Sequence, residues 1–150
     1  MATKVAINGF GRIGRLVARA ILSRTYHDLE LVSINDLGDA NANALLFKRD
    51  SVHGNWAGDV SVDGDFLVVD GKKIKVTAER DPANLQHAEL GVEIALECTG
   101  IFTSKDKASA HLTAGAKRVV ISAPGTNVDK TIVFGVNHDQ LSADDIGIYN

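Results

Sequence analysis

The sequence has 150 residues and a formal net charge of −3; 45% of the residues are hydrophobic and 23% are charged, as is usual for one globular domain. It shows no basic stripe that would suit nucleic acid, and no apolar run near the ~20 residues that a membrane span needs. One cysteine excludes an internal disulfide framework, and no signal-peptide stretch follows Met1, so we expect a cytoplasmic protein.

In the first third of the chain, short apolar runs alternate with helical periods. Residues 5–7 form a short apolar run that predicts a buried strand. Apolar residues on one helical face predict a helix over 13–24, and a second strand follows over 29–34. Residues 40–47 read as a helix with Asp39 as its N-cap. This alternation is typical of βαβ units around a parallel sheet.

The middle of the chain has a different pattern before the alternation resumes. Residues 59–76 are rich in Val and Asp, and their glycine turn signals predict two or three antiparallel strands. Strands are then expected over 92–96, 118–121, 131–134 and 146–149, with a helix over 104–114 that begins at Ser104 and stops at Gly115. We therefore expect one α/β domain over 1–150, a Rossmann-type, doubly wound and mostly parallel sheet with an antiparallel hairpin insertion.

A G-x-G-x-x-G motif lies between the first predicted strand and the first predicted helix. Gly9 would permit the tight turn, Gly11 would let a pyrophosphate approach the backbone, and Gly14 would let the helix pack on the strand. The helix start then offers free N–H groups to the phosphates. Asp36 follows the second strand, where a carboxylate can accept hydrogen bonds from an adenosine ribose. A glycine-rich turn without a ligand is the alternative, and the combination of strand, helix and acid favours a dinucleotide site.

Other candidate residues are ambiguous when taken alone. Thr99–Gly100 and Ser122–Gly125 follow predicted strands, so they could touch a cofactor or be ordinary turns. Arg12 could bind phosphate, although a solvated charge is commoner at such a position. Cys98 could be a nucleophile, but its neighbour Glu97 would raise its pKa, and a structural cysteine is the favoured interpretation. No histidine pairs with another histidine or with the cysteine at metal-ligand spacing, so no metal site is expected.

Several segments together carry a resemblance that runs over essentially the whole chain. They are INGFGRIGR at 7–15, IND at 34–36, DSVHG at 50–54, ERDP at 79–82, ECTGIFT at 97–103, HLTAGAKRVVISAP at 111–124 and FGVN at 134–137. In this order they resemble the glyceraldehyde-3-phosphate dehydrogenase family. One departure is Gln86-His87, where that family frequently has Pro-Trp.

The resemblance implies that NAD is the cofactor and where it would lie. Arg12 and Ile13 would meet the pyrophosphate, and Asp36 with Asn35 would hold the adenosine ribose. Arg80 would lie near the adenine through its backbone. Thr99, Gly100 and Phe102 would line the adenosine side, and Ser122 would lie toward the nicotinamide. With the glycine motif, the expected cofactor-binding set is Gly9, Phe10, Gly11, Arg12, Ile13, Gly14, Asn35, Asp36, Arg80, Thr99, Gly100, Phe102 and Ser122.

The resemblance also implies an activity, the phosphorylating oxidation of glyceraldehyde 3-phosphate in glycolysis by a homotetramer. The family's nucleophilic cysteine and its catalytic histidine would lie beyond Asn150, so we expect no catalytic residue in 1–150 and no activity from this chain alone. An erythrose-4-phosphate dehydrogenase is one alternative, against which the ERDP and ISAP segments argue. A stand-alone NAD-binding module without catalysis is another.

Overall fold

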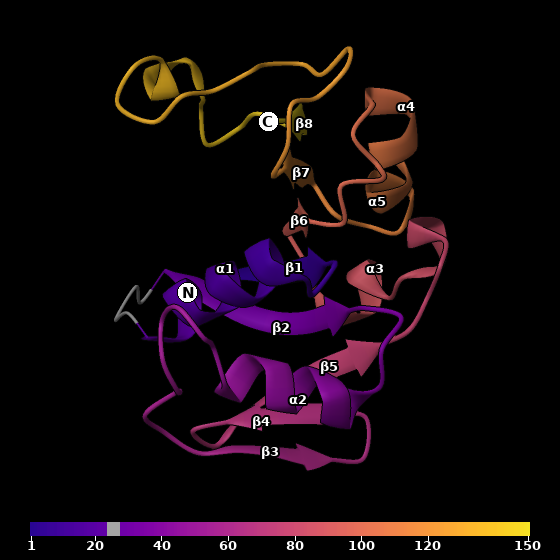
Figure 1. Ribbon diagram of the computed structural model, residues 1–150. Coiled ribbons are helices and arrows are strands. Elements are labelled where there is room, and N and C mark those ends of the chain that lie inside the picture. Colours follow the sequence, from indigo (N-terminus) through magenta and orange to yellow (C-terminus); the bar gives the residue numbers. More distant parts are fainter. Residues whose placement is uncertain (24–27) are drawn as a thin grey trace.

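A computed structural model describes residues 1–23 and 28–150, which form one eight-stranded sheet flanked by helices (Figure 1). The order across the sheet is β3-β4-β5-β2-β1-β6-β7-β8. The strands are β1 (Thr3–Asn8), β2 (Leu29–Asn35), β3 (Val60–Asp63), β4 (Phe66–Val69), β5 (Lys72–Thr77), β6 (Ile94–Glu97), β7 (Arg118–Ile121) and β8 (Gly147–Tyr149). Pairing is parallel except between β3 and β4 and between β4 and β5, so the predicted Rossmann-type, mostly parallel sheet is confirmed.

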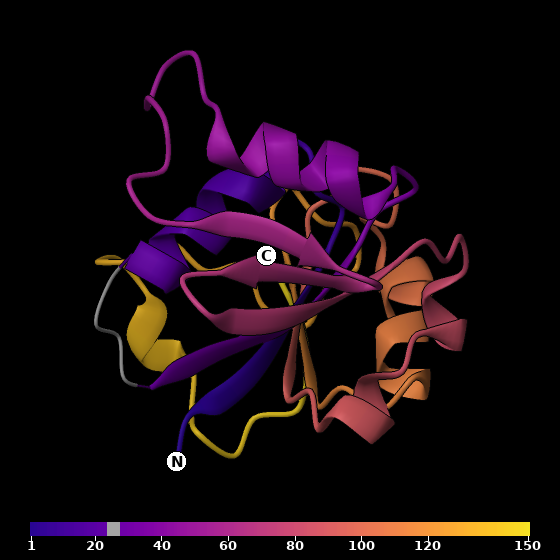
Figure 2. The same ribbon diagram turned by 90° about the horizontal axis from the view of Figure 1, so that it is seen from below.

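Helices cover both faces of the sheet, as Figures 1 and 2 show. One face carries α1 (Arg12–Ser23) and α2 (Ala40–Lys48), and the other carries α3 (His87–Leu90), α4 (Lys105–Ala108) and α5 (Ala110–Thr113). Because side chains alternate along a strand, Val5 and Ile7 of β1 join the first layer's core cluster while Ala6 joins a second cluster. Burial on both faces explains why residues 5–7 in the middle of β1 are all apolar. No helix in the described ranges is long and apolar enough to cross a membrane.

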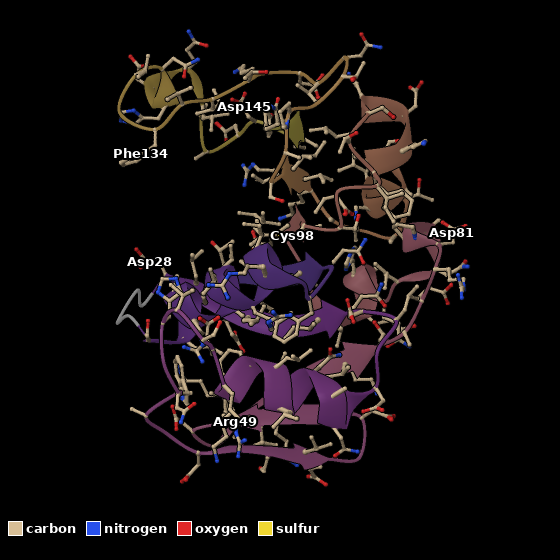
Figure 3. All side chains as sticks on the ribbon, in the orientation of Figure 1. Asp28, Arg49, Asp81, Cys98, Phe134 and Asp145 are labelled. Carbon is tan, nitrogen blue, oxygen red and sulfur yellow. The ribbon has the colours of Figure 1, made fainter. Side chains whose placement is uncertain are left out.

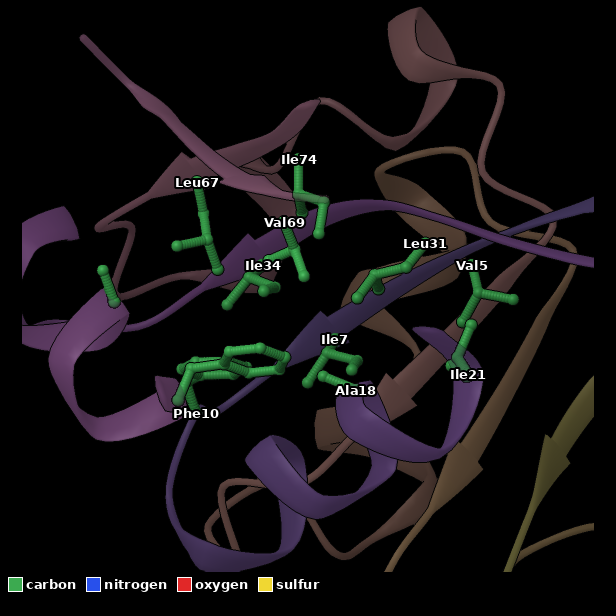
Figure 4. Packing of buried hydrophobic residues seen from close by; sticks show 12 residues of the cluster. Val5, Ile7, Phe10, Ala18, Ile21, Leu31, Ile34, Leu67, Val69 and Ile74 are labelled. Carbon is green, nitrogen blue, oxygen red and sulfur yellow. The ribbon is translucent and has the colours of Figure 1, made fainter. Parts of the chain in front are cut away.

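The main core lies between the first helical layer and the sheet (Figure 4). Phe10 stacks on Phe47 of α2 with ring centroids 6.2 Å apart, and Trp56 packs against Phe47 at 5.1 Å. Leu67 and Val69 of β4 are fully buried in the same cluster. The aromatic residues thus share one cluster with the buried side chains of the hairpin insertion, β3 and β4.

The segment predicted as an antiparallel insertion, residues 59–76, contains β3, β4 and most of β5, but β5 has two roles. It is antiparallel to β4 and parallel to β2, with Ser33 opposite Lys75. The insertion proper therefore comprises β3 and β4, and β5 belongs to the parallel sheet.

The predicted caps are confirmed. Asp39 accepts a hydrogen bond from the Ala42 N–H at 2.8 Å, and Ser104 accepts one from the Lys107 N–H at 3.3 Å. Gly115 ends the later helical segment with a φ of +116°, a conformation that favours glycine.

Several predicted boundaries differ from the structure. The helix expected over 104–114 is split into α4 and α5 at Ser109, whose hydroxyl donates to the Asp106 carbonyl at 2.6 Å and so competes with regular helix hydrogen bonding. The first helix begins one residue earlier than expected, at Arg12, and its expected end at Arg24 lies outside the described residues. The strand expected over 92–96 spans Ile94–Glu97. Three short elements had no counterpart in the sequence analysis: α3 and two 3-10 helices, Pro82–Asn84 and His138–Gln140.

The strand expected over 131–134 is wrong. This segment meets β8 through one isolated bridge, Lys130 with Tyr149, and then turns away. The side chain of Asn137 accepts from the Val133 N–H at 2.7 Å and donates to the Thr131 carbonyl at 2.9 Å. Backbone groups that a strand would pair with its neighbour are thus satisfied by one side chain.

Candidate functional site

A cleft of about 400 Å³ opens where β1, β2 and β6 end. Sheet order reverses here, because β2 lies on one side of β1 and β6 on the other, and ligands of open α/β sheets bind at such switch points. Figure 3 shows Cys98 at this position, between the two halves of the sheet. The lining residues are Asn8, Gly9, Gly11, Asn35, Asp36, Leu37, Glu79, Arg80, Cys98, Thr99, Ile101 and Phe102.

The three motif glycines have different structural roles. Gly9 has a φ of +91°, and a Cβ there would lie 2.7 Å from the Thr99 nitrogen. A Cβ on Gly14 would lie 2.0 Å from the Gly9 carbonyl oxygen, so this glycine permits close packing of α1 on the turn. A Cβ on Gly11 would meet nothing within 4 Å. Gly11 therefore leaves open space beside the start of α1, whose first N–H groups have no partner within the helix.

The Asp36 carboxylate is held in place at the end of β2. Its Oδ1 accepts from the Phe10 N–H at 3.0 Å, and its Oδ2 accepts from the Gly38 N–H at 3.1 Å. Each carboxylate oxygen can accept a further hydrogen bond. The geometry thus places an oriented, negatively charged acceptor at the cleft, next to the glycine turn.

Asn35 forms part of the cleft floor through internal hydrogen bonds. Its side-chain nitrogen donates to Asn8 Oδ1 at 2.7 Å and to the Glu79 carbonyl at 2.8 Å. Its oxygen accepts from the Thr77 hydroxyl at 2.7 Å and from the Glu79 N–H at 2.8 Å. Asn35 therefore joins β1, β2 and the segment after β5.

Arg12 has an ion-pair partner beside the start of α1. Its Nη1 lies 2.6 Å from Asp50 Oδ2, and Asp50 Oδ1 also accepts from the His53 N–H at 2.7 Å. The His53 N–H and the Arg12 guanidinium hold the pKa of Asp50 well below its usual range. The Arg12 guanidinium is thus engaged by Asp50, and neither side chain lines the cleft.

The remaining expected residues fall into two groups. Arg80, Thr99 and Phe102 line the cleft with Gly9, Gly11, Asn35 and Asp36. The other expected residues do not line the cleft; they are Phe10, Arg12, Ile13, Gly14, Gly100 and Ser122. Phe10 and Gly14 are buried, and Ile13 is 51% exposed. The structure adds residues that are each next to an expected residue in the sequence: Asn8, Leu37, Glu79, Cys98 and Ile101.

Cys98 lies in the cleft but is poorly suited to act as a nucleophile. Burial raises the pKa of its thiol, the Glu97 charge raises it further, and a hydrogen bond with Ser122 offsets part of this rise. The structural interpretation of Cys98 therefore agrees with its surroundings.

Sequence reasoning missed the buried side of the site. Glu97 Oε2 accepts from Asn8 Nδ2 at 2.7 Å and lies 2.6 Å from His111 Nε2, whose Nδ1 lies 3.0 Å from His87 Nε2. The residues lie on different elements, at separations in sequence of 14 and 24. A search of the sequence for closely spaced histidines and cysteines does not detect contacts between residues this far apart in the chain.

Comparison with known proteins identifies the family. The profile of the glyceraldehyde 3-phosphate dehydrogenase NAD-binding domain matches residues 3–105, a range that contains every residue lining the cleft. The chain is 68% identical to the glyceraldehyde-3-phosphate dehydrogenase of Zymomonas mobilis subsp. mobilis over 97% of this chain and 43% of that protein. It is 59% identical to the Xanthobacter flavus glyceraldehyde-3-phosphate dehydrogenase over 100% of this chain and 45% of that protein. It is also 59% identical to the Geobacillus stearothermophilus glyceraldehyde-3-phosphate dehydrogenase over 93% of this chain and 41% of that protein. The chain thus spans less than half the length of these relatives. It belongs to the glyceraldehyde-3-phosphate dehydrogenase family and contains that family's NAD-binding domain.

Proposed function

We propose that this chain binds NAD in the cleft between the ends of β1, β2 and β6, as the cofactor-binding part of a phosphorylating glyceraldehyde-3-phosphate dehydrogenase. One observation carries the proposal: the open space over Gly11 lies beside a helix start and next to the fixed carboxylate of Asp36. A cleft of about 400 Å³ is of the size that small-molecule and cofactor sites have.

The proposed pose follows the lining residues. The pyrophosphate would lie over Gly11 and accept hydrogen bonds from the first N–H groups of α1, at Arg12 and Ile13. The Asp36 carboxylate would accept from the adenosine ribose hydroxyls. Thr99, Gly100 and Phe102 would flank the adenosine, with the Arg80 backbone near the adenine and Ser122 toward the nicotinamide. Phe10 and Gly14 would contribute by holding the shape of the glycine turn. Asn35 would contribute by holding the floor of the cleft in place.

Bound NAD supplies the hydride acceptor, and the residues of this chain bind and orient it. The substrate, a small phosphorylated aldehyde, and assembly into a homotetramer are part of the proposal, as is a cytoplasmic location. The relatives named above are glyceraldehyde-3-phosphate dehydrogenases, which favours that substrate over erythrose 4-phosphate and favours an enzyme over a stand-alone binding module.

Selectivity for NAD over NADP tests the placement of the ribose. Each unit of negative charge on a 2′-phosphate 4 Å from the Asp36 carboxylate would be repelled by about 4 kcal/mol at an effective dielectric of 20. Screening and side-chain movement reduce this to about 2 kcal/mol, or about thirtyfold in affinity. We expect calorimetric titration of the 150-residue chain to show this preference, and Asp36→Asn to remove most of it.

Asp39→Asn is the matched control, because it removes a neighbouring charge and keeps an oxygen that can cap α2. It should leave the NAD to NADP ratio within about twofold of wild type. Equal affinities for the two cofactors in the wild-type chain, or an unchanged ratio in Asp36→Asn, would show that Asp36 does not face the ribose.

We also propose that the 150-residue chain has no dehydrogenase activity by itself. Its single cysteine has a raised pKa and lies against a carboxylate, so the chain offers no activated thiolate. NADH formation should not exceed the protein-free rate with glyceraldehyde 3-phosphate, phosphate and NAD. Turnover that persists through purification and disappears in Cys98→Ser would refute this.

A further inference from the structure

A row of buried polar side chains leads from the cleft to the opposite helical layer. Glu97 at the end of β6 is 1% exposed, His111 of α5 is 0% exposed and His87 of α3 is 3% exposed. His111 Nε2 lies 2.6 Å from Glu97 Oε2, and His111 Nδ1 lies 3.0 Å from His87 Nε2. The two rings are stacked, with centroids 5.3 Å apart. Groups buried this deeply are costly unless their hydrogen bonds are complete, so the row fixes its members relative to one another.

Glu97 connects this row to the wall of the cleft. Its Oε1 accepts from the Thr99 N–H at 3.0 Å and from the Thr99 hydroxyl at 2.5 Å. The Thr99 hydroxyl oxygen in turn accepts from the Ile101 N–H at 3.1 Å. Thr99 and Ile101 both line the cleft, so the orientation of one buried carboxylate sets the conformation of the 99–101 segment.

His111 and Asn8 both orient that carboxylate from the Oε2 side. Asn8 Nδ2 and His111 Nε2 donate to Oε2, since an ionised carboxylate can only accept. Burial alone would raise the pKa of Glu97, but hydrogen bonds from His111, Thr99 and Asn8 outweigh it and hold that pKa below its usual value. Behind His111, burial lowers the pKa of His87 to about 4, so its ring is neutral near pH 7 and its Nε2 meets His111 Nδ1 without adding charge.

We propose that His111 is a positioning residue for the cofactor site: supported by His87, it holds Glu97 in the orientation that fixes Thr99 and Ile101 at the cleft wall. Neither histidine lines the cleft. The inference rests on the proposed NAD site. It adds a residue that would affect NAD affinity without lining the cleft, because it supports the residues that do.

His111→Leu and His111→Gln in the 150-residue chain test the proposal. Leucine fills the space without a donor, whereas the glutamine amide can restore donation to Glu97. Ile148→Ala is the matched control, because Ile148 is 1% exposed in the core under α4 and α5 and its side chain has no hydrogen-bonding group. Two quantities are measured on folded protein: amide hydrogen exchange of Thr99 and Ile101 relative to Leu67, which is buried in the other core cluster, and NAD affinity by calorimetry.

We expect His111→Leu to speed exchange at Thr99 and Ile101 about tenfold relative to Leu67 and to weaken NAD binding about tenfold. His111→Gln should recover most of both effects, and Ile148→Ala should change neither selectively. Should His111→Leu not fold, His87→Leu carries the test: it leaves Glu97 paired but releases the His111 ring, so smaller changes in the same direction are expected.

Exchange at Thr99 and Ile101 that changes by the same factor as exchange at Leu67 in the His111 and His87 variants, or equal affinity losses in Ile148→Ala and His111→Leu, would overturn the positioning role. A Thr99→Val background adds a check, because His111→Leu should then cost less NAD affinity than it does in wild type. If the wild-type chain binds no NAD, the proposed site is wrong, while the exchange measurement still decides whether His111 holds the 99–101 segment.

Discussion

At the scale of single residues, Cys98 lies at the proposed site but lacks the low thiol pKa that a reactive cysteine needs. It lines the cleft, yet burial raises the pKa of its thiol and the Glu97 charge adds to the rise. We expect iodoacetamide to alkylate Cys98 at least about tenfold more slowly in the folded chain than in urea at neutral pH. Saturating NAD should slow the reaction further, because the thiol lies at the proposed site.

Mass spectrometry over a time course gives both rates without ambiguity, since the chain has one cysteine. A folded-state rate equal to that in urea would show that the thiol is exposed and ionised like a free peptide thiol.

At the scale of elements, the glycine turn allows binding and folding to be perturbed separately. A methyl on Gly11 enters open space, so Gly11→Ala should change the free energy of unfolding by less than about 0.5 kcal/mol. The same methyl would occupy the proposed pyrophosphate position, and NAD affinity should fall at least about tenfold. In Gly14→Ala the methyl would lie 2.0 Å from a carbonyl oxygen, and stability should fall by more than about 2 kcal/mol.

Urea denaturation and calorimetric titration of both variants give the two quantities. The prediction fails if Gly11→Ala binds NAD as tightly as wild type, or if it destabilises the chain as much as Gly14→Ala does.

The elements also show where sequence patterns are informative. Asp39 and Ser104 predict helix starts because a short polar side chain at that position can accept a hydrogen bond from a backbone N–H of the first turn. Both of these hydrogen bonds are present. The four-residue helix α3 is too short to show a period. Residues 131–134 look like a strand, but the side chain of Asn137, several residues later, takes the backbone groups that a strand would need. Local pattern cannot foresee such competition.

At the scale of the whole molecule, His87 makes stability depend on pH. Its pKa falls from 6.5 to about 4 on folding because burial disfavours the charged ring. Between these values the unfolded chain binds the proton and the folded chain does not. The free energy of unfolding therefore decreases as pH falls from 6.5 to about 4, by about 2 kcal/mol after allowance for solvent screening.

Urea denaturation from pH 7.5 to pH 4 tests this. His87→Gln should flatten the curve above about pH 5. Below the usual pKa of 4.5, protonation of Glu97 adds a further loss in both proteins, because that pKa is lowered on folding. A curve for His87→Gln that parallels wild type above pH 5 would contradict the assignment.

The part of the candidate site that follows the ends of the strands could be predicted from the sequence. Gly9, Gly11, Asp36, Arg80, Thr99 and Phe102 line the cleft, and all of them follow strands whose carboxyl ends meet at one edge of the sheet. The support behind the cleft could not be predicted, because it depends on contacts between separate elements: His111 of α5 meets Glu97 of β6 and His87 of α3. These residues are too far apart in the sequence for a local pattern to predict that they meet.

The central claim is that NAD occupies this cleft, and an NMR titration of the isotopically labelled chain tests it most directly. We expect saturable shifts of the amide signals of Gly9, Gly11, Leu37, Thr99 and Ile101, while signals of the β3–β4 hairpin stay in place. Absence of saturable shifts, or shifts centred on the hairpin and not on the glycine turn, would contradict the account.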